Sequence, residues 1–270
     1  MQLSLLYMFK RTIFSFQKNR AILFLIMLFA TATVFSQQQK KLDIVFIGNS
    51  ITYGAGLANK ATDAPPVHAA NYLKKHFSDV QFSNQGVSGF TTVDFLPSTN
   101  TAFKKVEQAA AAFANDKDAT LVFSMILGTN DSAIEGPNGS PVSPASYEGN
   151  VKSITDRLLK DFPTCKVVLH RPIWYSPNTY NGSRYLQEGL DRLQSYFPVL
   201  DKIVKEYAVS HPKQVFAGDK DAFNHFKKNH KALFQYEKGN AGTFFLHPNE
   251  KGAEELGKFW GKAIAKAIDN

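Results

Sequence analysis

A serine at the end of a predicted strand is the residue of this chain best placed for nucleophilic chemistry. Ser50 lies in the segment Gly-Asn-Ser-Ile-Thr at 48–52, directly after the apolar run at 43–47. Short β-branched runs of this kind are typical of strands buried on both faces of a parallel sheet. Gly48 permits a sharp turn that would present the Ser50 hydroxyl. The serine could equally cap a following helix, so this motif alone leaves both interpretations open.

Three later segments carry groups that could act together with Ser50. Residues 84–89 follow the second predicted strand, Asn130 follows the third within Gly-Thr-Asn-Asp, and His247 precedes the last predicted helix. Acyl transfer needs a nucleophile, a base that removes its proton, and donors for the oxyanion. An imidazole is the natural base near neutral pH. Taken singly, Gly86 could merely end a strand and Asn130 could merely form an Asx-turn.

These blocks, in this order, resemble the SGNH (GDSL-type) hydrolase superfamily, and the resemblance covers residues 44–268. It implies an esterase in which Ser50 is the nucleophile and His247 the base. It also implies that the N–H groups of Ser50 and Gly86 and the side-chain amide of Asn130 bind the oxyanion. No cofactor is expected from this resemblance.

Two positions depart from the family pattern. The nucleophile block has Asn49 where aspartate is usual, and Phe244 stands three residues before His247, where the family places its acid. A backbone carbonyl could orient His247 in a Ser–His dyad, or Asp219 could supply the acid, or activity could be lost and only binding remain. Glu250 is a weaker candidate, because it can instead cap the final helix.

The elements that must position these residues alternate between strand and helix, which predicts an α/β fold of three layers, α/β/α, around a five-stranded parallel sheet. This is the flavodoxin-like arrangement that the family resemblance also implies. The predicted strands are 44–47, 80–83, 121–127, 166–169 and 214–217. The predicted helices are 66–76, 103–115, 146–161, 185–207 and 250–268.

The N-terminus predicts export. Residues 1–36 hold four basic side chains, no acidic ones and a short apolar run, which is typical of a secretory signal peptide cleaved after Ser36. An uncleaved anchor is the alternative, although the run is shorter than the roughly 20 residues of a membrane span. We therefore expect a secreted or periplasmic hydrolase domain over residues 37–270, with no stable membrane span.

Composition excludes several other classes. Removing residues 1–36 lowers the formal net charge from +8 to +4, so the remaining basicity predicts no nucleic-acid partner. The single cysteine, Cys165, cannot form an intramolecular disulfide and is interpreted as a packing residue. His225 and His230 are five residues apart, which does not align them as metal ligands on one helix face. We therefore assign no metal site.

The expected substrate is an acylated carbohydrate or another small ester. Arg171, Trp174 and Tyr175 follow the fourth predicted strand and could bind sugar rings and carboxylates. The chain looks like carbohydrate acetylesterases, including those acting on sialic acid. The alternatives are a lipase or lysophospholipase, a thioesterase, and a catalytically silent carbohydrate-binding protein. The loops at 135–144 and 176–183 are too polar to form the apolar lid of a lipase.

Overall fold

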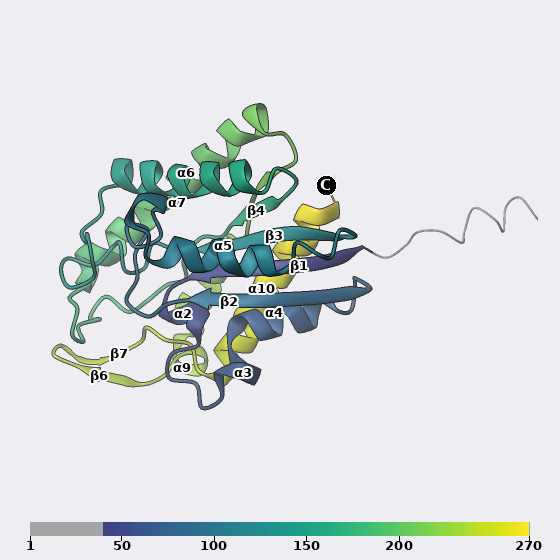
Figure 1. The fold of residues 1–270 in the computed structure, drawn as a ribbon. Coiled ribbons are helices and arrows are strands. Elements are labelled where there is room, and N and C mark those ends of the chain that lie inside the picture. The colour runs from purple at the N-terminus through teal and green to yellow at the C-terminus, as the bar shows by residue number, and fades with distance from the viewer. Residues whose placement is uncertain (1–39, 270) are drawn as a thin grey trace, which may run out of the picture. The chain divides into compact units, whose positions relative to one another are not determined.

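The structure is a computed structural model that describes residues 40–269, so the predicted signal peptide lies outside the described residues. Five parallel strands form the central sheet in the order β2-β1-β3-β4-β5 (Figure 1). The strands are β1 (Lys41–Gly48), β2 (Asp79–Gly86), β3 (Ala119–Ile126), β4 (Lys166–Leu169) and β5 (Val215–Ala217). The predicted α/β fold with a five-stranded parallel sheet is confirmed.

Helices cover both faces of this sheet (Figure 1). The helices α4 (Pro65–Leu73) and α10 (Glu250–Asp269) pack together, and Trp260 of α10 stacks on Phe46 of β1 at 6.1 Å between ring centroids. The other long helices are α5 (Ala102–Ala112), α6 (Pro144–Asp161) and α7 (Leu186–Ser210). Short helical segments are α2 (Ser50–Tyr53), α3 (Lys60–Asp63), η1 (Pro97–Thr99), α8 (Ala222–Lys228) and α9 (His230–Leu233).

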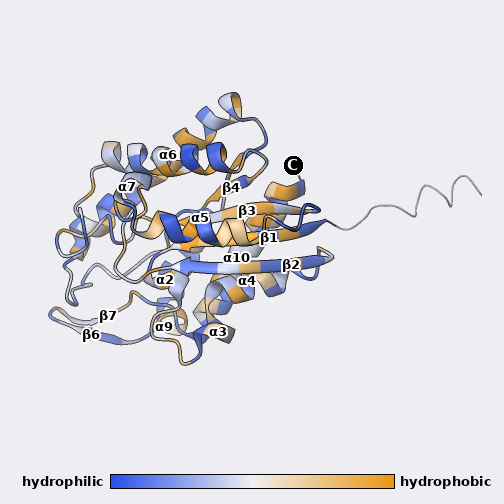
Figure 2. Ribbon diagram, viewed as in Figure 1, coloured by the Kyte–Doolittle hydropathy of each residue, from blue (hydrophilic) through white to orange (hydrophobic). Residues whose placement is uncertain are grey.

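The apolar pattern of the strands explains their places in the sheet. Every residue of β1 after Lys41 is buried, as expected for a strand with neighbours on both edges and helices on both faces. By contrast, β2 is hydrophilic along much of its length and forms an edge of the sheet (Figure 2). Cys165 is buried, and burial raises the pKa of its thiol to about 12, in keeping with a packing role.

A two-stranded antiparallel hairpin lies outside the main sheet and was not predicted. It consists of β6 (Glu237–Gly239) and β7 (Gly242–Phe244), with Glu237 directly opposite Phe244. The turn residues Asn240 and Ala241 connect the two strands. The hairpin immediately precedes His247, so it determines what surrounds that side chain.

The strand register places the carboxyl ends of β1, β2 and β3 level with one another at one end of the sheet. Gly48, the last residue of β1, pairs with Gly86 on one side and with Ile126 on the other. The segments that follow these three strands therefore begin side by side. They contain Ser50, Gly89 and Asn130. Open α/β sheets bind ligands at this carboxyl end of their strands.

Candidate active site

Ser50 is the first residue of the short helix α2. The preceding residue, Asn49, is buried, and its Oδ1 accepts a hydrogen bond of 3.0 Å from the Ile51 N–H. This cap fixes the turn between β1 and α2. Either an asparagine or an aspartate oxygen can accept this hydrogen bond, so the unusual Asn49 keeps the geometry of the nucleophile turn.

A hydrogen-bonded chain joins Ser50 to a carboxylate. The Ser50 Oγ lies 2.9 Å from His247 Nε2, and His247 Nδ1 lies 2.9 Å from Oε2 of Glu237. The other carboxylate oxygen of Glu237 accepts a 3.0 Å hydrogen bond from the His247 backbone N–H. Since a carboxylate can only accept, His247 must carry its proton on Nδ1 and turn the Nε2 lone pair toward Ser50.

The hairpin explains how a glutamate occupies the place of the family's aspartate. Glu237 stands directly across the hairpin from Phe244, the position where the family places its acid. Opposed residues of an antiparallel pair project to the same face, with Cβ atoms about 5 Å apart. A carboxylate on β6 therefore reaches the space that one on β7 would fill, while Phe244 is buried in the core.

The prediction that Asp219 orients His247 is wrong, and so is the dyad without an acid. Asp219 is buried two residues before Asp221, the N-cap of α8, and its carboxylate accepts hydrogen bonds from the N–H groups of Asp221 (3.2 Å) and Ala222 (3.0 Å). Burial is the main cause that raises the pKa of Asp219. The Asp219 carboxylate is bonded to these two backbone N–H groups, and the His247 ring faces Glu237 instead.

Asn130 lies at the same edge of the sheet and is held from two sides. Its Nδ2 donates to the Phe90 carbonyl at 2.8 Å, and its Oδ1 accepts from the Tyr185 hydroxyl at 2.8 Å. An amide nitrogen carries two hydrogens. Only one of them is used in the contact with Phe90.

Gly86, the glycine predicted to donate to the oxyanion, is engaged elsewhere. Its N–H donates to Asn84 Oδ1 at 2.9 Å, and a Cβ there would lie 2.4 Å from the Tyr53 nitrogen. Gly86 is therefore required for close packing against α2. Among the described residues, the N–H of Gly89 has no hydrogen-bond partner, and Gly89 adjoins the Phe90 carbonyl that holds Asn130. Its φ of +83° favours glycine.

Comparison with known proteins identifies the family. Residues 46–255 match the GDSL-like lipase/acylhydrolase family. The chain belongs to this family. This membership makes the protein an acylhydrolase, and the prediction of an ester hydrolase is confirmed. No curated protein matches it significantly.

Several solved structures of esterases and lipases share the fold at low sequence identity. The carbohydrate acetylesterase Est24 from Sinorhizobium meliloti aligns with a TM-score of 0.54 and 15% identity, covering 83% of this chain and 99% of Est24. The aryl esterase of M. smegmatis gives 0.55 and 14%, covering 84% and 99%. A lipase/acylhydrolase from Enterococcus faecalis gives 0.54 and 18%, covering 83% and 96%.

The three predicted substrate-binding residues do not serve this GDSL-type site directly. Arg171 donates to Asp201 of α7 at 2.7 Å, and its guanidinium lies 5.1 Å from the Phe197 ring. Trp174 is 6% exposed and packs against His230, and Tyr175 is fully buried. Aromatic side chains after a strand can serve either packing or binding. Here the rings of Trp174 and Tyr175 both pack in the core.

A second serine–histidine contact lies inside the core. Ser124 Oγ is 3.0 Å from His170 Nε2, and both residues are at most 2% exposed. His170 Nδ1 accepts a 3.0 Å hydrogen bond from the Asp219 N–H. The proton of His170 therefore sits on Nε2 and faces Ser124, so this imidazole has no lone pair to take a proton from that serine.

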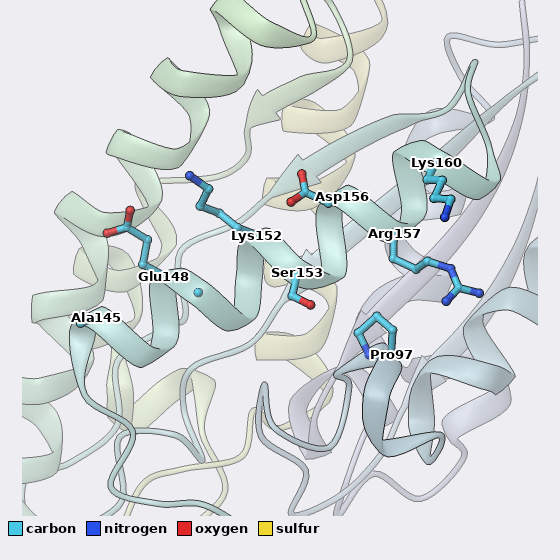
Figure 3. Close-up of a pocket in the computed structure, with 9 residues that line it drawn as sticks. Pro97, Ala145, Glu148, Lys152, Ser153, Asp156, Arg157 and Lys160 are labelled. Carbon is cyan, nitrogen blue, oxygen red and sulfur yellow. The ribbon is translucent and has the colours of Figure 1, made fainter.

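Other features of the described residues lie apart from Ser50. A groove of about 830 Å³ runs along α6, and Figure 3 shows the side chains that line it. Three of its charged side chains form ion pairs, Lys152 with Glu206, Arg157 with Glu107 and Glu148 with Lys202. Within residues 40–269, no three His, Cys, Asp or Glu side chains are grouped to hold a metal. No helix in that range has the length and apolarity to cross a membrane.

Proposed function

We propose that this GDSL-type hydrolase cleaves carboxylic esters through an acyl-enzyme on Ser50. The observation that carries the proposal is the hydrogen-bonded chain from Glu237 through His247 to Ser50. In this proposal Glu237, and not Asp219, is the acid. With Ser50 and His247 it forms a complete triad, so the site is not a Ser–His dyad. The carboxylate fixes the imidazole tautomer and stabilises the imidazolium that forms during reaction.

The reaction takes place in two half-reactions. The Ser50 Oγ attacks the acyl carbon while its proton moves to His247 Nε2, and the carbonyl oxygen becomes an oxyanion. As the intermediate collapses, the bond to the alcohol oxygen breaks and Nε2–H gives its proton to that oxygen. Water then loses a proton to Nε2 and attacks the acyl-serine. The second collapse returns the proton to Ser50 and releases the carboxylic acid.

Three donors are placed to bind the oxyanion in this proposal. They are the backbone N–H groups of Ser50 and Gly89 and the second Nδ2 hydrogen of Asn130. The Ser50 and Gly89 N–H groups donate to no other described residue, which supports this assignment. Loss of one such donor typically costs about 3 kcal/mol of transition-state stabilisation.

The substrate we propose is an acetylated carbohydrate. Support comes from the fold shared with a carbohydrate acetylesterase and from Tyr53, which is 44% exposed three residues after Ser50. An exposed ring in this position can stack on a sugar. A lipase or thioesterase of the same family is the alternative, and longer acyl chains would distinguish it.

The decisive experiment compares two serine variants on p-nitrophenyl acetate. We expect Ser50→Ala to lose activity by about 10⁴-fold or more while Ser124→Ala stays within about threefold of the wild type. Retained activity in Ser50→Ala would refute the proposed nucleophile. A preference for p-nitrophenyl octanoate over acetate, or no release of acetate from acetylated sugars, would refute the acetylesterase assignment.

We also propose that the protein is exported and cleaved after Ser36. The support is the charged and apolar pattern of residues 1–36. N-terminal sequencing of the protein recovered outside the cytoplasm should begin at Gln37, or show a blocked pyroglutamate there. An intact Met1 on membrane-bound protein would instead identify an uncleaved anchor.

A further inference from the structure

The orientation of the Asn130 amide determines whether this residue can assist the proposed reaction. An oxyanion is stabilised by an N–H donor and repelled by a carbonyl oxygen. The Phe90 carbonyl accepts from Nδ2 and the Tyr185 hydroxyl donates to Oδ1, each at 2.8 Å. These two contacts satisfy opposite ends of the amide. They leave one Nδ2 hydrogen for a substrate oxygen.

Tyr185 is built to act as a donor. Its side chain is 4% exposed, and its ring meets that of Tyr175 edge-on at 5.4 Å. Burial first, and then the carboxylates of Asp131 and Glu237, raise the pKa of Tyr185 well above its usual range. The hydroxyl therefore keeps its proton throughout the pH range in which an esterase works.

The loop that ends in Tyr185 also supports the other half of the site. Ser176 exchanges two hydrogen bonds with the Phe245 backbone, both of 2.9 Å. Asn178 Nδ2 donates to the carbonyls of Ala241 and Thr243 at 3.1 and 2.7 Å. Residues 176–185 thus touch both the hairpin that supplies Glu237 and the amide of Asn130.

We propose that Tyr185 is a positioning residue whose hydroxyl orients and polarises the Asn130 amide for oxyanion binding. The inference rests on the proposed function, since it assigns Tyr185 a role through Asn130. A hydrogen bond accepted by the amide oxygen strengthens the donor at the amide nitrogen, because hydrogen bonds in a chain polarise one another. Without the hydroxyl, the buried Oδ1 also loses its partner.

The first test is Tyr185→Phe, which removes one oxygen and keeps the ring. We expect kcat for p-nitrophenyl acetate to fall about tenfold with KM nearly unchanged, because the lost contact acts in the transition state. Tyr196→Phe is the matched control. Tyr196 is also buried and donates to a carbonyl, that of Val142 at 2.6 Å, whereas the Asn130 side chain bonds to Phe90 and Tyr185. It should lower Tm without lowering kcat.

The second test is a double-mutant cycle. If Tyr185 acts through Asn130, Tyr185→Phe should have no further effect on kcat in an Asn130→Ala background. Asn178→Ala, which loosens the hairpin, should still lower kcat there, because it acts through Glu237 and His247. Equal, additive losses for Tyr185→Phe in both backgrounds would overturn the positioning role.

A binding measurement keeps the proposal testable if Asn130→Ala does not fold. A boronic acid forms a tetrahedral adduct with the nucleophilic serine and resembles the transition state. Tyr185→Phe should raise its Ki by the same factor as kcat falls. An unchanged Ki would overturn the inference. Activity in Ser50→Ala would instead refute the proposed function, so the two failures are distinguishable.

Discussion

Two serine–histidine pairs in this protein have almost the same separation and opposite chemistry. The distance from Oγ to Nε2 is 2.9 Å for Ser50 and His247 and 3.0 Å for Ser124 and His170. The difference lies at Nδ1, which faces the Glu237 carboxylate in the first pair and accepts from a backbone N–H in the second. The partner of the second nitrogen decides whether a histidine can act as a base.

The two pairs also differ in their exposure to solvent. Ser50 and His247 are partly exposed at the sheet edge, with the His247 side chain 15% exposed, whereas His170 is 1% exposed in the core. A substrate can reach the first pair and not the second. Burial lowers the pKa of His170 to about 3, so its ring stays neutral and serves as a hydrogen-bonding core residue.

The largest effect that separates the pairs should come from the histidines. We expect His247→Gln to lower kcat/KM by about 10⁴-fold, because no other group is placed to take the Ser50 proton. His170→Gln can keep one acceptor and one donor and should leave kcat/KM within about threefold. Ester hydrolysis and Tm measured together distinguish these outcomes. A large loss in His170→Gln with normal Tm would reverse the assignment of the two pairs.

A smaller but sharper effect should follow from the acids. In Glu237→Gln, the amide oxygen can accept the hydrogen bond from the His247 backbone N–H, and the amide NH₂ then faces Nδ1. His247 would adopt the tautomer of His170, with its proton toward Ser50. We expect kcat to fall about 10³-fold with little change in KM.

Asp219→Asn is the matched control for the acid. Its oxygen can still accept from the Ala222 N–H at the first residue of α8, so kcat should remain within about threefold while Tm falls slightly. A loss in Asp219→Asn that equals the loss in Glu237→Gln would show that the hydrogen bond between Glu237 and His247 does not determine activity.

The pH dependence of stability should distinguish the buried histidine. Because the pKa of His170 is lowered to about 3, the unfolded chain binds the proton first as pH falls below about 6.5. Stability is then lost on acidification, by about 2 kcal/mol at pH 5. Asp131 acts in the opposite sense, since burial raises its pKa to about 6 and its contribution falls as pH rises from about 4 to 6.

The difference between variants isolates the histidine. Denaturant unfolding of the wild type and of His170→Gln should show the wild type losing about 2 kcal/mol relative to the variant between pH 7.5 and pH 5. Asp131 is common to both proteins and cancels. If the free energy of unfolding changes equally with pH in the two proteins, folded His170 takes up its proton as readily as it does in the unfolded chain.

The sequence was sufficient for the sheet because apolar β-branched runs are local signals that define strands. The Ser50–His247 pair was predicted from the resemblance of ordered sequence blocks to a known family, since the turn after β1 alone leaves the role of the serine open. The acid was missed because Glu237 reaches His247 through a hairpin with three-residue strands. Its only local sign was the run of turn formers at 239–242. Whether two such short strands pair depends on the tertiary structure around them.

Two other errors had the same origin. Trp174 and Tyr175 are aromatic residues just after a strand, and sequence cannot tell whether such rings face a ligand or the core. Gly86 and Gly89 lie in one block, and spacing does not show which N–H is already bonded. For the two aromatic rings the answer depends on residues distant in the chain. For Gly86 it depends on the nearby Asn84 side chain, which accepts the Gly86 N–H, and on the distant Tyr53 nitrogen, which excludes a side chain at position 86.

The smallest effect tests the turn that sets Ser50 apart from Ser124. Ser50 begins a helix capped by Asn49, whereas Ser124 lies within β3. Asn49→Ala removes the acceptor of the Ile51 N–H and should lower the free energy of unfolding by about 1 kcal/mol. Because the same cap holds the Ser50 turn, kcat should fall a few-fold as well. Asn49→Asp retains the acceptor and should preserve kcat. An equal loss of kcat in both variants would show that the Asn49 amide nitrogen, and not the cap, supports the nucleophile.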